Sequence, residues 1–118
     1  MPGEFTEALQ DSDMVTVDVT GRVTGRQIAN PVWFVQEPGM VYLLPVRGSD
    51  TSWFKNLRAI PAVRLTADGA SVSAQAEPVT DQSRAQEIVQ KFRAKYGPDQ
   101  IKRYYSKLDV AVEVSVPA

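Results

Sequence analysis

The sequence contains neither cysteine nor histidine among its 118 residues. Their absence excludes serine–histidine–aspartate and cysteine–histidine hydrolysis, thiolate chemistry and the usual zinc sites. No remaining side chain has an ordinary pKa near neutrality, so acid–base catalysis would need a strongly shifted carboxylate, lysine or tyrosine. An enzyme with this composition would most naturally take its chemistry from a bound cofactor.

Long apolar runs are also missing. No segment approaches the roughly 18 apolar residues that a membrane span needs, and the acidic N-terminus does not follow the pattern of a signal peptide. Because cysteine is absent, no disulfide supports an extracellular location. We therefore expect a cytoplasmic protein.

The charges are nearly balanced, with 13 basic and 14 acidic residues, which argues against a dedicated nucleic-acid binder. They are nevertheless segregated along the chain. Residues 1–20 carry five acids and no base, whereas residues 21–64 carry six bases and two acids. This asymmetry favours a local anionic ligand over a long polyanion.

Alternating apolar residues and turn signals predict a single domain over residues 1–118 that is mainly β, with helices packed outside a small antiparallel barrel (α+β). Hairpin-linked strands without β-α-β alternation exclude a doubly wound parallel sheet. The expected strands cover residues 14–20, 27–36, 41–46, 63–67, 70–79 and 110–116. The expected helices cover residues 3–10, about 52–59 after the third strand, and 81–96 and 98–105 before the last strand.

Some local features are expected within this outline. The helix over residues 3–10 should cap one barrel end, and Asp68-Gly69 is the strongest hairpin signal in the chain. Pro31 cannot donate to a sheet ladder, so we expect an edge or a bulge there. Thr80 is expected to cap the helix that Gly97 ends.

Two glycine-containing turns could bind an anion. In the Gly21–Arg26 turn, backbone amides and two flanking arginines could form a nest for a charged group, but a solvated hairpin turn is equally consistent with the spacing. Arg47-Gly48-Ser49 leads into a helix, whose first amides favour phosphate, although a capped loop has the same pattern. Trp33 and Trp53 could wall a flat ring or belong to the core. Tyr104 and Tyr105 could donate a proton or a hydrogen bond to a substrate, or pack with their hydroxyls outward.

Two motifs lie on either side of the predicted hairpin: Gly21-Arg22-x-Thr24-Gly25, followed by Pro31-Val32-Trp33, and Arg47-Gly48, followed by Trp53-x-x-Asn56-Leu57. Together they resemble the deazaflavin-dependent nitroreductase family, which lies within the split-barrel flavin reductases related to pyridoxamine-phosphate oxidase. The resemblance is close over residues 15–68. This sequence departs from the family at Val23, where a basic residue is usual, and in its shorter loop after Arg47.

The resemblance implies a split antiparallel β-barrel of about six strands that binds coenzyme F-420, or FMN in sister branches. It also implies hydride transfer from the reduced cofactor to a quinone, a nitro compound or an activated enone. The resemblance also implies a role for each group of residues. The polar tail of the cofactor would lie near Arg22, Thr24, Gly25 and Arg26, its phosphate would be held by Arg47, Gly48 and Ser49, and its ring would be backed by Pro31, Val32 and Trp33. The helix that closes the pocket would be fixed by Trp53 and Asn56, and the substrate would lie under Tyr104 and Tyr105.

Other functions are consistent with the same residues. One is a non-catalytic split-barrel module that holds a flavin, a tetrapyrrole or an apolar ligand without turnover. Another is a purely structural barrel that dimerises through apolar faces. The sequence does not decide the physiological substrate, the choice between F-420 and FMN, or whether the chain is a monomer or a homodimer.

Overall fold

Six antiparallel strands close into a barrel in the order β1-β2-β3-β6-β5-β4. This computed structural model describes residues 2–116. The strands are β1 (Met14–Thr20), β2 (Gln27–Glu37), β3 (Met40–Leu43), β4 (Ala62–Ala67), β5 (Ala70–Val79) and β6 (Ala111–Ser115). The helices are α1 (Pro2–Gln10), α2 (Ser52–Ala59), α3 (Gln82–Tyr96) and α4 (Pro98–Tyr104), with a 3-10 turn, η1 (Gly48–Asp50), before α2. The predicted order of elements and the split-barrel fold class are confirmed.

The barrel core follows from the alternation in the strands. Val15, Val17 and Val19 of β1 are fully buried, whereas the residues between them face outward. β1 pairs with both β2 and β4, and this second pairing closes the barrel. The hairpin expected at Asp68-Gly69 is confirmed, because both residues have the positive φ angles, 48° and 81°, that a tight hairpin turn needs.

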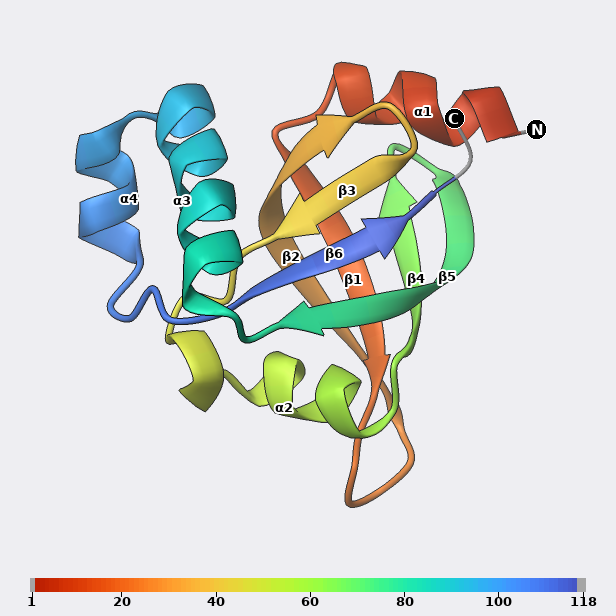
Figure 1. The fold of residues 1–118 in the computed structure, drawn as a ribbon. Coiled ribbons are helices and arrows are strands. Elements are labelled where there is room, and N and C mark those ends of the chain that lie inside the picture. The colour runs from red at the N-terminus through yellow and green to blue at the C-terminus, as the bar shows by residue number, and fades with distance from the viewer. Residues whose placement is uncertain (1, 117–118) are drawn as a thin grey trace.

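The helices cover three sides of the barrel (Figure 1). α1 closes one end, where Phe5 and Leu9 join the barrel core, so its predicted role as a cap is confirmed. α2 covers the other end and contributes Phe54 and Leu57 to the same core. α3 and α4 pack on the outside of the barrel and form a second apolar cluster, to which α3 contributes Phe92. None of the helices in residues 2–116 has the length and apolar character required to span a bilayer.

The structure decides one local prediction and corrects two others. Of the edge or bulge expected at Pro31 it has the edge: Pro31 pairs in continuous register with Thr16, and beyond β1 this half of β2 is a free edge that needs no amide donor. The third strand ends at Leu43 rather than residue 46, since Pro45 cannot continue the ladder. Asp81, not Thr80, caps α3, and its carboxylate accepts a hydrogen bond from the Arg84 amide.

Candidate functional site

A cavity of about 360 Å³ lies between β2, α2 and the end of α4, and most of its wall is aromatic or apolar. We call it the aromatic cavity. The lining residues are Met14, Asn30, Pro31, Val32, Trp33, Leu44, Val46, Trp53, Tyr104 and Tyr105. The structure thus brings together, in one cavity, the residues that were expected behind the ring, both tyrosines and Trp53.

Trp33 is held rigidly at one side of the aromatic cavity. Tyr96 of α3 stacks on its indole ring, with centroids 4.4 Å apart and planes 7° apart, and Tyr104 meets it edge-on at 5.6 Å. The Tyr96 hydroxyl lies 2.9 Å from the carbonyl oxygens of Asp13 and Phe34 and accepts a hydrogen bond from the Phe34 amide. Because these contacts fix Tyr96, Trp33 offers a preformed aromatic surface.

Tyr105 is the buried polar group of the aromatic cavity. Its side chain is packed against α3, and the residue is only 6% exposed. Burial raises the pKa of its phenol, so the hydroxyl stays protonated at neutral pH. Among residues 4–116 no fully buried side-chain oxygen or nitrogen lacks a partner, and the Tyr105 hydroxyl forms no hydrogen bond with these residues. The hydroxyl is therefore not completely buried, and it is free to donate to a ligand that reaches it.

Arg22 lies beside the helix that closes the aromatic cavity. The Asn56 side-chain oxygen accepts hydrogen bonds from the Arg22 amide at 3.2 Å and from its guanidinium at 2.6 Å. Asn56 is 4% exposed and follows Trp53 by three residues on α2, so the two side chains lie about one turn apart on the same helix face. The arrangement holds a guanidinium near the Trp53 end of the cavity.

The Gly21–Arg26 turn satisfies half of its own amides internally. Gly21 donates to the Arg26 carbonyl, Gly25 donates to the Gly21 carbonyl, and the Arg26 amide donates to the Thr24 hydroxyl. The Arg22 amide is bound to Asn56, whereas the amides of Val23 and Thr24 form no hydrogen bond with the described residues. The turn therefore offers a ligand these two consecutive amides and its two guanidiniums, and Gly25 serves the turn through its positive φ of 75°.

The segment 47–50, which we call the 47–50 turn, does not line the aromatic cavity. The Arg47 amide donates to the Thr51 hydroxyl at 2.8 Å, while the amide and the hydroxyl of Ser49 both donate to the Asp109 carboxylate. Burial alone would raise the pKa of Asp109, but the hydrogen bonds from Ser49 and the charge of Lys107 outweigh it and hold the pKa below its usual value. The Arg47 amide and both donors of Ser49 are thus engaged within the chain, whereas the Arg47 guanidinium forms no ion pair with the described residues.

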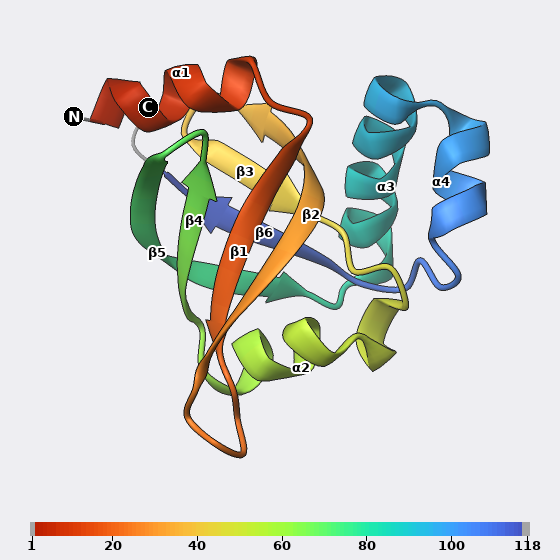
Figure 2. The same ribbon diagram turned by 180° about the vertical axis from the view of Figure 1, so that it is seen from behind.

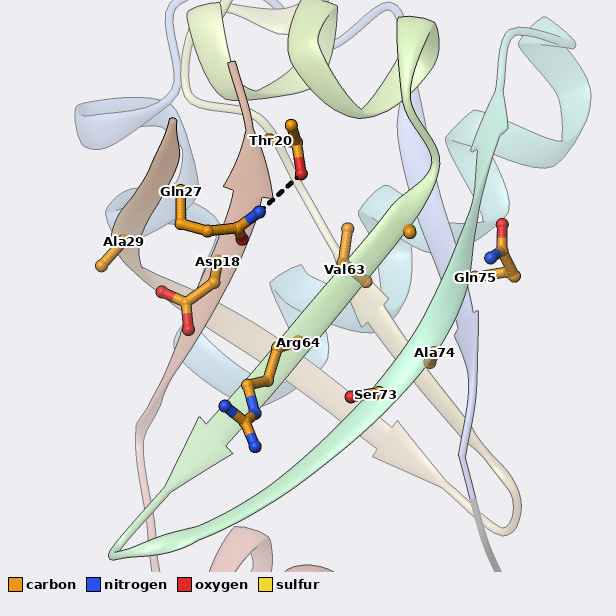
Figure 3. Close-up of a pocket in the computed structure, with 10 residues that line it drawn as sticks. Asp18, Thr20, Gln27, Ala29, Val63, Arg64, Ser73, Ala74 and Gln75 are labelled. Atoms are coloured by element: carbon orange, nitrogen blue, oxygen red, sulfur yellow. Dashed lines mark hydrogen bonds between the residues drawn. The ribbon is translucent and has the colours of Figure 1, made fainter. Parts of the chain in front are cut away.

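A second concavity, of about 810 Å³, lies on the face of the barrel that no helix covers (Figure 2). We call it the sheet groove. Figure 3 shows its wall of short polar and apolar side chains, with Asp18 and Arg64 pointing outward and Gln27 bonded to Thr20 at 2.8 Å. It contains no aromatic side chain and none of the predicted site residues. The aromatic cavity is therefore the better candidate for a flat ring.

Several residues of the site were missed from the sequence. Met14 and Leu44 looked like ordinary strand residues, and Tyr96 looked like one more apolar position of a helix. The register of β1 on β2, which pairs Met14 with Trp33, is what places Met14 in the wall. Asp109 carries no local signal at all, because its partner Ser49 is 60 residues away in the chain.

The profile of the F-420H2-dependent quinone reductase family matches residues 1–117. Among solved structures, an F-420-H2 dependent reductase (FDR-A) superposes with a TM-score of 0.69 at 20% identity, covering 87% of this chain and 94% of that one.

Two other solved structures share the fold. The haem storage protein HutZ from Vibrio cholerae superposes with a TM-score of 0.72 at 16% identity, covering 98% of this chain and 89% of that one. A putative pyridoxamine 5′-phosphate oxidase from Listeria innocua superposes with a TM-score of 0.69 at 10% identity, covering 99% of this chain and 94% of that one.

Proposed function

The chain belongs to the F-420H2-dependent quinone reductase family, and we propose that its aromatic cavity is where the deazaflavin ring and the acceptor substrate meet. The protein is an F-420-dependent oxidoreductase, with FMN as the secondary alternative for the cofactor. When bound, reduced coenzyme F-420 supplies a hydride, which amounts to two electrons and one proton. A quinone needs one further proton to become a hydroquinone, and solvent can provide it.

The residues present fit this cofactor. A flat ring needs apolar, aromatic walls, and the aromatic cavity has Trp33 and Trp53 on its lining. A phosphorylated tail needs cationic donors nearby. Arg22 supplies one, because Asn56, which lies one helical turn after Trp53 on α2, holds its guanidinium. No histidine or cysteine is required, because the cofactor carries the redox chemistry.

The observation that carries the proposal is that Tyr105, whose hydroxyl has no hydrogen-bond partner among residues 4–116, lines a cavity whose wall is mostly aromatic or apolar. We infer that this hydroxyl donates a hydrogen bond to an oxygen of the bound ring or of the acceptor. Because its pKa is raised, it acts as a hydrogen-bond donor rather than as the source of the proton. Tyr104 is 54% exposed and lies against the Trp33 edge, so we assign it to the mouth of the cavity, where it shields the acceptor from water.

The experiment is a binding titration with two matched blocking variants. Val46→Trp fills the aromatic cavity, and Ser73→Trp fills the sheet groove; both replace an exposed side chain on the rim of a concavity. We expect fluorescence titration of F-420 to show binding to the wild type and to Ser73→Trp, and greatly weakened binding to Val46→Trp. Binding that is lost only in Ser73→Trp would place the cofactor in the groove and overturn the proposal.

Turnover distinguishes an enzyme from a module that only binds. Reduced F-420 is mixed with wild-type protein and menadione, and oxidation is followed by the recovery of the deazaflavin absorbance. We expect oxidation that depends on the protein concentration. Binding without oxidation of the cofactor would favour the non-catalytic module instead.

We also propose that the protein acts in the cytoplasm and associates as a homodimer. The absence of cysteine supports the first, and the helix-free face of β1, β4 and β5 in Figure 2 supports the second. Cell fractionation tests the location. Size-exclusion chromatography with light scattering tests the association state, and a monomer at all concentrations would refute the dimer.

A further inference from the structure

The 47–50 turn already holds an anion, and that anion belongs to the chain itself. The Ser49 amide donates to one oxygen of the Asp109 carboxylate at 3.0 Å, and the Ser49 hydroxyl donates to the other at 2.6 Å. A carboxylate held by two donors from one residue takes up the donors that would otherwise be available to a phosphate at this turn. The amide and the hydroxyl of Ser49 are therefore both engaged.

The backbone of the turn is shaped around this carboxylate. Gly48 has a φ of +55°, and a Cβ at this position would lie 2.0 Å from an oxygen of Asp109 and 3.0 Å from the Lys107 carbonyl oxygen. The segment that carries Asp109 is itself fixed to the turn, because the Ser106 amide donates to the Val46 carbonyl at 2.8 Å and Arg47 forms a β-bridge with Lys107. The contact thus belongs to a packed junction of two segments.

The charges around the turn are also balanced internally. The Lys107 ammonium lies 3.2 Å from the Asp50 carboxylate and 3.7 Å from that of Asp109. Arg47 is exposed, and its guanidinium forms no ion pair with the described residues. A phosphate bound at the Ser49 donors of this turn would approach the Asp109 carboxylate and the neighbouring Asp50. Like charges at such short range oppose binding.

The Arg22 side of α2 has no such carboxylates among the described residues. The Arg22 guanidinium is oriented by a neutral amide, the Asn56 side chain, and no carboxylate of residues 4–116 lies within 4 Å of this guanidinium. An anion that approaches Arg22 gains a charge-assisted contact without displacing a charged partner.

We propose that Asp109 is a specificity-determining residue, which fills the anion position of the 47–50 turn so that the phosphorylated tail is held from the Arg22 side of α2. This inference rests on the proposed function, because it concerns the tail of the same cofactor. It assigns Arg47 a minor part in cofactor binding in the wild-type protein. It also predicts that neutralising Asp109 opens a second anion contact.

The test compares two substitutions that remove one negative charge from the same junction. Asp109→Asn keeps the side-chain shape and an oxygen acceptor, whereas Asp50→Asn removes an exposed carboxylate that Ser49 does not contact. We expect Asp109→Asn to tighten F-420 binding about tenfold, the value of one charge-assisted hydrogen bond. Asp50→Asn should change it by less than about twofold, and neither should alter the affinity for the phosphate-free deazaflavin chromophore.

Arg47→Ala in both backgrounds completes a double-mutant cycle. In the wild type we expect it to weaken F-420 binding by less than about twofold, while Arg22→Ala weakens it about tenfold. In the Asp109→Asn background, Arg47→Ala should return the F-420 affinity to about its wild-type value. An unchanged or weakened affinity in folded Asp109→Asn, or an Arg47→Ala loss in the wild type as large as that of Arg22→Ala, would overturn the proposal.

Two further outcomes are distinguishable. If Asp109→Asn does not fold, the wild-type comparison of Arg47→Ala with Arg22→Ala decides between the two subsites. If the wild type binds no F-420, the proposed function fails, and inorganic pyrophosphate becomes the probe. Pyrophosphate should then raise the melting temperature of Asp109→Asn, and Arg47→Ala in that background should remove the increase. The inference would be refuted if pyrophosphate did not raise the melting temperature of Asp109→Asn.

Discussion

Replacing Tyr105 with phenylalanine removes one oxygen atom from the wall of the aromatic cavity and leaves the packed ring in place. The hydroxyl has no hydrogen-bond partner among residues 4–116, so no buried donor or acceptor is left unpaired. We therefore expect the free energy of unfolding to change by less than about 0.5 kcal/mol.

The effect on activity should be much larger. If the hydroxyl donates to an oxygen of the ring or acceptor, its loss removes a hydrogen bond worth about 0.5–1.5 kcal/mol in the bound state. Donors to an oxygen that gains negative charge during reaction are worth more, up to about 100-fold or beyond in rate. We expect kcat/KM with menadione to fall about 10- to 100-fold, measured anaerobically by stopped-flow absorbance of F-420.

Tyr104→Phe is the matched control, because it removes the same atom from the neighbouring exposed ring. It should change kcat/KM by less than about threefold, since an exposed hydroxyl exchanges its contact with water at little net cost. A Tyr105→Phe enzyme with wild-type kcat/KM and an unchanged melting temperature would refute the role assigned to this hydroxyl.

Three other predictions concern stability and pH. Asn56→Ala removes the acceptor for both Arg22 hydrogen bonds and should lower the free energy of unfolding by about 1–3 kcal/mol in urea; an unchanged midpoint would contradict the anchoring role. Gly48→Ala combines a positive φ with a clash against Asp109 and should cost about 2–4 kcal/mol, against about 1 kcal/mol for Gly69→Ala, which has a similar φ but open space; equal losses would contradict the packing argument. Because burial raises the Tyr105 pKa in the folded state, its contribution to stability is complete below about pH 10 and is lost as the pH rises above it. Alkaline unfolding of Tyr105→Phe should therefore begin at a higher pH, and identical profiles would refute this.

Local patterns predict the elements of this protein well. The alternation of Val15, Val17 and Val19 identifies β1 as a half-buried strand, and Asp68-Gly69 identifies the hairpin of β4 and β5, because both signals depend only on neighbours in the chain. The covered strand β3 is also predictable, since it is apolar on both faces and packs against the barrel core on one and α3 on the other.

Contacts between distant segments could not be predicted in the same way. The closure of β1 on β4 and the hydrogen bonds from Arg22 to Asn56 depend on the finished barrel. The hydrogen bonds from Ser49 to Asp109 could not be predicted either, because the sequence near one residue gives no indication of the other. Residue types therefore indicated a possible phosphate turn, while the competing carboxylate could be recognised only in three dimensions.

The structure gathers the residues that the motif assigns to the ring but not those that it assigns to the tail. Pro31, Trp33 and Trp53 lie together in the aromatic cavity. Of the residues assigned to the tail, Arg22 lies beside α2, whereas Gly48 packs against Asp109. Motif spacing preserves the helix and strand positions that form the cavity, but a single carboxylate can change which donors remain free for a ligand.

The central claim is that the deazaflavin ring binds in the aromatic cavity, and the two tryptophans of the chain allow it to be tested directly. Both line that cavity, and no tryptophan lies in the sheet groove. In a ¹H–¹⁵N NMR titration with F-420, the account predicts large shifts of both indole signals, assigned with Trp33→Phe and Trp53→Phe. Indole signals that stay in place while the amides of Arg64 and Ser73 shift would contradict it.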